Sequence, residues 1–311
     1  MQHDIAIPGT DLQVSPVALG TVKAATWMQH EADTIFNTYL EHGGNIIDTA
    51  RVYTPPSIGV SEERIGQWLR SSHKRNQVVL VTKGGHPDVQ HMHTSRMDPA
   101  AMRRDLEQSL RALCTETIDL YLYHRDDEHQ SVGKLLECME QFRREGKIRW
   151  YGCSNWRTSR LKEAWQYAQE HDLRGFAANQ CEYNVGVRYM KPAKDDTMVA
   201  ADEEMLSFHE KSQFALMAYC SLCGGFFHKL SAHGVDAVRE KRYLTEQNLK
   251  VADRLAALQA KYHASLSQVE LGFLLTQPFP TTALAGVSNP EQLYDLMNVQ
   301  NIPFMEQDYQ L

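Results

Sequence analysis

The sequence lacks the features that mark several specialised classes of protein. No apolar run approaches the ~18–20 residues that a helix needs to cross a bilayer. Lysine and arginine number 32 and aspartate and glutamate 39, and the net charge of −7 disfavours nucleic acid as the main partner, because neutralising phosphates requires clustered cations. The first residues, MQHDIAIPGTDLQ, lack the basic region and apolar core of a signal peptide. We therefore expect neither a membrane nor nucleic acid as partner.

Cysteines are few for a chain of 311 residues, and they are scattered. This distribution fits free thiols in a reducing compartment, so the expected location is cytoplasmic. Cys220 and Cys223 have the spacing of a redox or zinc pair, but no second such pair accompanies them. The cluster His86, His91 and His93 is interpreted as part of a solvated loop. The sequence thus predicts neither a disulfide nor a metal site.

Short β-rich runs alternate with helical patterns along the chain. Most of the runs are nearly continuous in apolar character, as expected for strands covered on both faces. The predicted strands are 17–21, 45–48, 78–83, 118–124, 147–153, 176–182, 214–220 and 282–287. Helical periodicity is present at 31–42, 61–70, 98–114 and 247–263. In the third helix, Asp98 is suited to the N-cap and Pro99 to the first helical position.

Eight strand–helix units in about 300 residues, without a linker-like segment, predict one α/β domain over 1–311 with the (β/α)8 TIM-barrel fold. A doubly wound sheet is the alternative, and it is disfavoured because no G-x-G-x-x-G turn follows the first strand. The segment DIAIPGTDLQVS alternates on both sides of a Pro-Gly-Thr turn. It predicts an N-terminal β-hairpin that caps the bottom of the barrel.

Polar residues end three successive predicted strands. Asp48, Lys83 and His124 are the last residues of the second, third and fourth runs, and Tyr53 comes five positions after Asp48. Each of these residues could instead have an ordinary structural role, such as capping a helix, packing in the core or extending into solvent. In a barrel, however, all of them lie at the carboxyl ends of the strands, where catalysis takes place.

These four side chains have a joint chemical use. A tyrosine hydroxyl has a pKa near ~10, and a nearby ammonium favours its phenolate form. We therefore expect Asp48 to position Lys83 and Lys83 to lower the pKa of Tyr53. Tyr53 would then act as an acid or base, while His124 orients a carbonyl oxygen.

Seven segments in order resemble those of the aldo-keto reductase family, bacterial type. They are IIDTARVY with SEERIGQWL, VTKGG, DLYLYHRDD, GKIRWYGCSNW, NQCEYN, AYCSLCGGF and GVSNPEQL. The resemblance covers nearly the whole chain. It implies an NAD(P)H-dependent oxidoreductase that reduces aldehydes or ketones to alcohols or catalyses the reverse reaction on CH–OH donors. Hydride would move to or from the nicotinamide, and Tyr53 would transfer the proton.

The resemblance also implies the cofactor contacts. Ser154, Asn155 and Gln180 would bind the nicotinamide carboxamide, and Tyr219 would stack on its ring. The remaining predicted cofactor residues are Gly20, Thr21, Cys220, Ser221 and Leu222 near the ribose and pyrophosphate, and Ser288, Asn289 and Gln292 at the adenosine end. Trp27 is the candidate wall of the substrate pocket.

One departure from the family bears on cofactor choice. Many members place a lysine or arginine near the end of the eighth strand, where it binds the 2′-phosphate of NADPH. Residues 281–311 contain no lysine, arginine or histidine, and Gln292 occupies a position where arginine is common. Because a phosphate without a cation loses its strongest hydrogen bonds, this absence suggests weak preference for NADP, or use of NAD.

Two other functions are compatible with the same residues. Lys83 at a barrel strand end could form a Schiff base, as in an aldolase. The barrel could also be a non-catalytic protein that senses the cofactor. The substrate, the direction of reaction and the oligomeric state cannot be read from the sequence.

Overall fold

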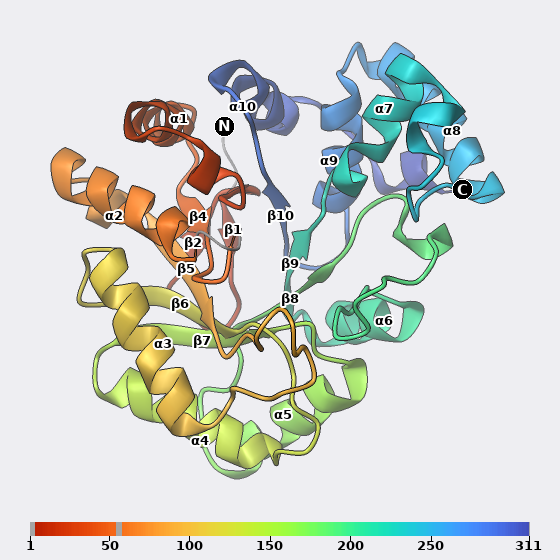
Figure 1. Cartoon of the computed structure of the whole chain (residues 1–311). Helices are drawn as coiled ribbons and strands as arrows, with labels where there is room; N and C mark the ends of the chain where they lie inside the picture. Colours follow the sequence, from red (N-terminus) through yellow and green to blue (C-terminus); the bar gives the residue numbers. More distant parts are fainter. Residues whose placement is uncertain (1–3, 54–57, 311) are drawn as a thin grey trace.

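The computed structural model describes residues 4–53 and 58–310. Eight parallel strands close into a barrel in the order β10-β3-β4-β5-β6-β7-β8-β9, with helices around the outside (Figure 1). The barrel strands are β3 (Val17–Gly20), β4 (Ile46–Asp48), β5 (Val79–Gly84), β6 (Ile118–Tyr123), β7 (Ile148–Ser154), β8 (Ala178–Glu182), β9 (Ala215–Tyr219) and β10 (Thr281–Ala285). The predicted (β/α)8 barrel is confirmed, and each predicted strand boundary lies within two residues of the observed one.

The helices connect successive strands on the outside of the barrel. They are α1 (Gln29–Glu41), α2 (Val60–Ser72), α3 (Pro99–Ala112), α4 (Val132–Arg144), α5 (Thr158–Glu170), α6 (Glu203–Ser212), α7 (Phe226–His233), α8 (Glu246–Tyr262), α9 (Leu266–Leu275) and α10 (Pro290–Met297). The predicted cap of α3 is confirmed, because the Asp98 side chain accepts hydrogen bonds from the backbone amides of Ala100 and Ala101. Among the described residues, no helix is long and apolar enough to cross a membrane.

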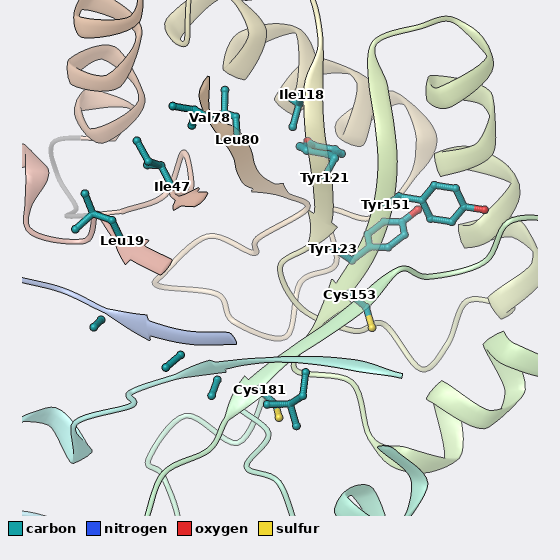
Figure 2. Packing of buried hydrophobic residues seen from close by; sticks show 14 of the residues in the cluster. Leu19, Ile47, Val78, Leu80, Ile118, Tyr121, Tyr123, Tyr151, Cys153 and Cys181 are labelled. Atoms are coloured by element: carbon teal, nitrogen blue, oxygen red, sulfur yellow. The ribbon is translucent and has the colours of Figure 1, made fainter. Parts of the chain in front are cut away.

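The strands are rich in apolar residues because nearly all of their positions are buried on both faces. One set of side chains, including Leu19, Ile47, Leu80 and Tyr121, packs between the barrel and the helices (Figure 2). The alternate set fills the barrel interior and includes Ala18, Ile46, Val81, Leu120 and Leu122. This inside–outside alternation makes the barrel a packed core.

A short hairpin precedes the barrel, formed by the antiparallel strands β1 (Ile5–Ala6) and β2 (Gln13–Val14). Its residues Ile7, Leu12 and Val14 are buried in the cluster that fills the barrel interior. In the same hairpin, Asp11 accepts a hydrogen bond of 2.7 Å from the Trp150 indole of β7. The predicted hairpin cap is therefore confirmed.

The long connection between β9 and β10 holds three helices instead of one. Residues of α7, α8 and α9 form a small separate core, which Tyr309 near the carboxyl end joins. The Tyr309 hydroxyl donates to the carbonyl of Val269 in α9 at 2.8 Å. The carboxyl-terminal segment is thus attached to the side of the barrel.

A buried histidine that contacts β8 lets us predict how the stability of the protein depends on pH. His209 of α6 is fully buried, and its Nδ1 donates to the Phe214 carbonyl at 2.7 Å. Its Nε2 then accepts from the Asn179 amide at 3.4 Å, so the ring is neutral. Burial lowers the pKa of His209 to about 4. The unfolded chain takes up a proton near the ordinary histidine pKa of about 6.5, so this contribution to stability is complete above that pH and is lost as the pH falls toward 4.

We expect the free energy of unfolding to fall between pH 7 and pH 5, with about 2 kcal/mol of the loss due to His209. Urea denaturation at both pH values would measure the loss in the native protein and in His209→Gln, which cannot titrate. The variant should show the smaller loss. Equal losses in the two proteins would show that His209 is not the responsible group.

Candidate active site

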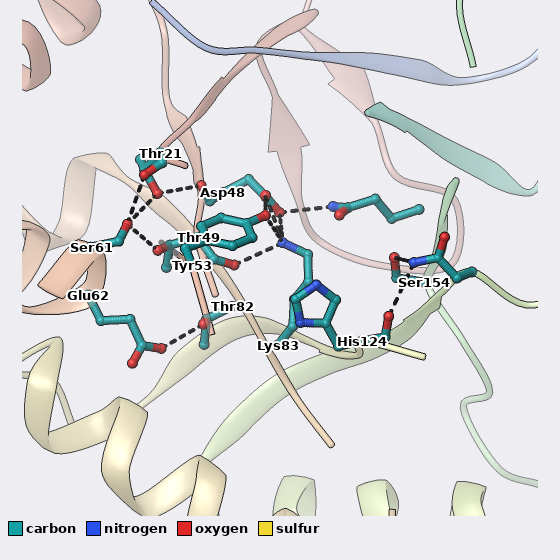
Figure 3. Close-up of polar contacts among 12 residues, drawn as sticks. Thr21, Asp48, Thr49, Tyr53, Ser61, Glu62, Thr82, Lys83, His124 and Ser154 are labelled. Carbon is teal, nitrogen blue, oxygen red and sulfur yellow. Dashed lines mark hydrogen bonds and ion pairs between the residues drawn. The ribbon is translucent and has the colours of Figure 1, made fainter. Parts of the chain in front are cut away.

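The three polar strand ends meet at the carboxyl mouth of the barrel. Asp48 is the last residue of β4, Lys83 lies near the end of β5, and His124 directly follows β6. Their strands are neighbours, with Asp48 in register with Val81 of β5. Tyr53 enters the same opening from the loop after β4 (Figure 3). The structure therefore brings together all four predicted catalytic side chains.

Lys83 is the centre of a buried polar network. Its Nζ lies 2.8 and 2.9 Å from the two Asp48 carboxylate oxygens, 2.9 Å from the Thr49 carbonyl and 2.9 Å from the Tyr53 hydroxyl. The Tyr53 hydroxyl lies 3.1 Å from Asp48 Oδ1. The Lys83 and Asp48 side chains are each only 1% exposed. Burial of both charges is tolerated because each is paired and hydrogen-bonded.

A set of hydroxyls holds the strand that carries Asp48. Ser61, at the start of α2, lies 2.8 Å from both the Thr21 and Thr49 hydroxyls. Thr21 donates both its amide and its hydroxyl to the Asp48 carbonyl, at 3.0 and 2.9 Å. The supporting roles of Ser61 and Thr49 were not predicted, and the only signal in the sequence is the position of Ser61 within SEERIGQWL.

The electrostatics of Tyr53 differ from expectation. Burial and the adjacent Asp48 raise the pKa of Tyr53 well above its usual value. The overall shift is therefore upward, opposite to the lowered pKa expected from Lys83, because burial and the Asp48 carboxylate dominate it. Tyr53 carries its proton at neutral pH, which suits a proton donor.

His124 is a neutral ring with free hydrogen-bonding capacity. Burial, assisted by His86, Lys83 and Arg125, lowers the pKa of His124 well below its usual value. Its buried Nδ1 has no hydrogen-bond partner among the described residues. The His124 ring packs edge-on at 6.1 Å from Tyr53, measured between ring centroids. A neutral imidazole in this position can hydrogen-bond to a carbonyl oxygen beside the phenol.

His86 was assigned to a solvated loop, and this assignment is wrong. His86 is 9% exposed, and its ring lies 4.6 Å from that of His124. Its position directly after VTKGG was the available signal. In contrast, the His91 and His93 side chains are 70% and 76% exposed, as expected. No group of residues suited to a metal occurs in the described part of the chain, and its six cysteines are unpaired.

The residues predicted to bind the nicotinamide carboxamide lie beside this network. Ser154 ends β7, Asn155 follows it with a left-handed φ of 62°, and Gln180 lies in β8. The Gln180 amide reaches across the mouth and donates to Asp48 Oδ2 at 2.9 Å. The Ser154 hydroxyl accepts from the Asn155 amide at 3.0 Å and retains its own proton for a ligand. These groups have the chemistry that a carboxamide requires.

Asn155 already uses its full hydrogen-bonding capacity. Its amide nitrogen donates to the Ser154 hydroxyl and the His124 carbonyl. Its oxygen accepts from the Val199 amide at 3.0 Å and the Tyr219 hydroxyl at 2.7 Å. Asn155 therefore connects the ends of β6, β7 and β9 with the loop before α6, and contact with a carboxamide would require one of these bonds to be exchanged.

The other predicted cofactor residues lie on the loops after β3, β9 and β10. Ser221 donates to the Leu284 carbonyl of β10 at 2.6 Å, and this bond fixes the loop that contains Cys220 and Leu222. Cys220 has a left-handed φ of 53°. Gly20 is in register with Asp48. On the loop after β10, the Gln292 side-chain oxygen accepts from the Ser288 backbone amide, and the Gln292 backbone amide donates to the Asn289 side-chain oxygen. Their contacts with a cofactor remain predictions.

Trp27, the predicted substrate wall, lies in the loop after β3. It is 7% exposed and packs edge-on against Phe36 of α1, with 6.3 Å between ring centroids. The structure therefore places much of this side chain in the core, and its contact with substrate remains a prediction.

The chain is similar to known proteins in sequence and in fold. The model of the aldo/keto reductase family matches residues 16–311. The chain is 27% identical over 313 residues to aldo-keto reductase YhdN of Bacillus subtilis, covering 94% of this chain and 87% of that protein. It is 23% identical over 324 residues to aryl-alcohol dehydrogenase GME11368 of Pestalotiopsis microspora, covering 99% and 80% of the two chains.

The fold has a close counterpart among solved structures. An aldo/keto reductase from Klebsiella pneumoniae, crystallised with NADP and acetate, matches with a TM-score of 0.74 and 23% identity, over 99% of this chain and 93% of that chain. This similarity supports the barrel, while the family model spans nearly all of the sequence. The chain therefore belongs to the aldo/keto reductase family and is an oxidoreductase.

Proposed function

We propose that this protein reduces aldehydes or ketones to alcohols, or catalyses the reverse reaction, with NADPH or NADH. The observation that carries the proposal is the hydrogen-bonded chain Asp48–Lys83–Tyr53 beside the neutral ring of His124 at one barrel mouth. A nicotinamide held by Ser154, Asn155 and Gln180 would supply or accept the hydride. The groups described here exchange the proton and orient the carbonyl.

Tyr53 is the proposed proton donor to the carbonyl oxygen. Its raised pKa keeps the phenol protonated at neutral pH. As the proton leaves, negative charge develops on the Tyr53 oxygen, and the Lys83 ammonium at 2.9 Å stabilises it. Asp48 holds that ammonium in position through both carboxylate oxygens. The network thus supports a charge that forms only during the reaction.

His124 is proposed to hold the substrate carbonyl next to Tyr53. Because its pKa is lowered, the ring is neutral and can donate one hydrogen bond without an added charge. The edge-on contact between the two rings fixes the distance between the His124 imidazole and the Tyr53 hydroxyl. Ser154, Gln180 and, after exchange of a bond, Asn155 are proposed to hold the nicotinamide carboxamide, and Tyr219 to stack on its ring.

A direct test is titration of the protein with NADPH and, separately, NADH, followed by quenching of intrinsic fluorescence. NADPH consumption would then be measured over a panel of aldehydes and ketones. We expect saturable binding of at least one cofactor and consumption that depends on the carbonyl compound. Tight binding without turnover on any member of the panel would favour a cofactor-sensing protein.

Borohydride treatment in the presence of a carbonyl compound tests the aldolase alternative. A Schiff base on Lys83 would be reduced to a stable adduct that mass spectrometry detects. We expect no adduct, since the Lys83 ammonium is bound by the Asp48 carboxylate and the Thr49 carbonyl. An adduct on Lys83 together with no binding of either cofactor would overturn the proposed reductase.

A further inference from the structure

A serine, a histidine and a glutamate contact one another on the outside of the barrel. Ser267 and Glu270 belong to α9, and His228 belongs to α7, which packs against α9 in the small separate core (Figure 1). The Ser267 hydroxyl lies 3.0 Å from Nε2 of the His228 ring. On the opposite side of the ring, Nδ1 lies 3.2 Å from a Glu270 carboxylate oxygen. None of these groups takes part in the proposed reduction of carbonyl compounds.

The Glu270 carboxylate is buried in an apolar core. Glu270 is 0% exposed, and neither of its oxygens has a well-formed hydrogen bond in the part of the chain that the structure describes. Burial raises the pKa of Glu270, and the ion pair with His228 opposes that rise. Because a buried carboxylate is costly even when it is paired, an apolar side chain in this place would cost less. The carboxylate therefore serves the histidine more than the packing of α7 against α9.

His228 is oriented as a general base toward Ser267. Because Nδ1 faces the negatively charged carboxylate, Nδ1 carries the ring proton, and Nε2 is left to accept the proton of the Ser267 hydroxyl. The contact with Glu270 raises the pKa of His228 and so makes Nε2 a stronger base. Serine, histidine and acid meet in the same order in the catalytic triads of serine hydrolases.

The start of α9 supplies hydrogen-bond donors beside the Ser267 hydroxyl. A capping box between Ser265 and Gln268 occupies the backbone amides of those two residues. The Leu266 and Ser267 amides have no partner among the described residues, and the first amides of a helix point out of its end. In serine proteases, the amide of the nucleophile is itself one of the two donors that stabilise the oxyanion. The Leu266 and Ser267 amides can act in this way.

We propose that Ser267, His228 and Glu270 form a second active site, which hydrolyses small neutral carboxylic esters with Ser267 as the nucleophile. The Ser267 oxygen bonds to the acyl carbon while its proton passes to His228 Nε2. The bond to the leaving alkoxide then breaks, and His228 returns the proton to that alkoxide. Water cleaves the resulting acyl-serine by the same proton transfers, which releases a carboxylic acid and restores the Ser267 hydroxyl. Glu270 is a positioning residue, because it acts through His228.

The surroundings of the site favour a small, uncharged substrate and exclude the nearby thiol as nucleophile. The His228 side chain is 41% exposed and Ser267 is half-buried, so both groups can be reached from solvent. Asp295 of α10 also raises the pKa of His228, and the negative charges of Glu270 and Asp295 disfavour an anionic ester. Cys223 lies beside the Glu270 carboxylate, but it is 1% exposed, and burial raises the pKa of its thiol well above the usual value.

Covalent labelling identifies the nucleophile directly. A fluorophosphonate probe phosphonylates an activated serine and releases fluoride, and mass spectrometry of the digested protein locates the adduct. We expect an adduct on Ser267 in the native protein and none on that peptide in Ser267→Ala. The matched control is Ser72→Ala, because Ser72 is also a half-buried helical serine, but its hydroxyl donates to the Trp68 carbonyl of its own helix at 2.7 Å. This control should be labelled like the native protein.

Hydrolysis of 4-nitrophenyl acetate measures the activity. We expect Ser267→Ala and His228→Gln to lower kcat/KM by about 10²–10⁴-fold, the usual contribution of a positioned proton transfer, and Ser72→Ala to leave it unchanged. Because His228 must be unprotonated to accept a proton, the native rate should rise with pH through a midpoint above the ordinary histidine pKa. Glu270→Gln should lower both the maximal rate and that midpoint, since the variant loses the charge that raises the pKa of His228.

The pH profile separates a catalytic role from a structural one. If Glu270 only fixed the packing of α7 against α9, Glu270→Gln would leave the midpoint in place, and the proposal would be overturned. Labelling of another residue in place of Ser267, or ester hydrolysis by Ser267→Ala at the native rate, would also overturn it. Thermal unfolding of each variant would establish that the protein is folded in the assay. Any of these failures would leave the proposed reductase intact, because its residues lie at the barrel mouth.

Discussion

Replacement of Tyr53 by phenylalanine is expected to lower kcat for carbonyl reduction by about 10²–10⁴-fold, the usual contribution of a positioned general acid. The change removes a hydroxyl that lies within hydrogen-bond distance of both Lys83 and Asp48. Cofactor affinity should change little, because the groups predicted to hold the carboxamide are Ser154, Asn155 and Gln180. The loss should therefore appear in turnover and not in binding.

The variant should fold normally. Among the described residues, Lys83 Nζ has four oxygen neighbours but only three protons, so after the change it retains both Asp48 oxygens and the Thr49 carbonyl as acceptors. Asp48 Oδ1 loses one donor but keeps the ammonium. The remaining network is fully paired, and the ring still fills the same space.

Tyr121→Phe is the matched control, since it deletes the same atom elsewhere in the barrel. Tyr121 of β6 faces the outer helices (Figure 2), and its buried hydroxyl has no hydrogen-bond partner in the part of the chain that the structure describes. This control should leave kcat unchanged and stability equal or slightly higher, because an unpaired buried hydroxyl is removed. Steady-state rates and cofactor titrations on all three proteins make the comparison, and native kcat in Tyr53→Phe would overturn the catalytic assignment.

Lys83→Met is expected to cost about 3–5 kcal/mol of unfolding free energy, the typical penalty for breaking a buried ion pair from one side. The Asp48 carboxylate would remain buried, with the Gln180 amide and the Tyr53 hydroxyl as its hydrogen-bond donors. Removing both charges avoids that penalty. The double variant Asp48→Asn, Lys83→Met should therefore be more stable than Lys83→Met alone, while both remain inactive.

Urea denaturation of the two single variants and the double variant forms a cycle that measures the coupling of the pair. Arg103→Gln is the control, because Arg103 pairs with Glu145 at 2.6 Å where the side chains are 37% and 31% exposed. Exposed pairs contribute at most about 1 kcal/mol, so its effect should be small. A double variant as unstable as Lys83→Met would show that lost packing, and not the unpaired charge, causes the destabilisation.

The sequence by itself determined the architecture and which residues form the candidate catalytic group. Short β-rich runs, most of them nearly continuous in apolar character, indicate strands with two buried faces, and they predicted the eight barrel strands within two residues. Because parallel strands end at the same face of a barrel, Asp48, Lys83 and His124 had to meet once their strands were recognised. These predictions depend on local periodicity and on the order of strands and helices, and both can be read from the sequence.

Tertiary structure alone decided the properties that depend on distance and burial. The Tyr53 pKa is raised because the ring is buried against Asp48, and no spacing in the sequence conveys how completely Lys83 is matched by that carboxylate. His86 is buried at the mouth, although its loop reads as polar. Lys23 meets Ser288 only because the barrel closes between its first and last strands. Periodicity in the sequence indicates which faces are buried, but which side chain pairs with a charged residue depends on the closed barrel.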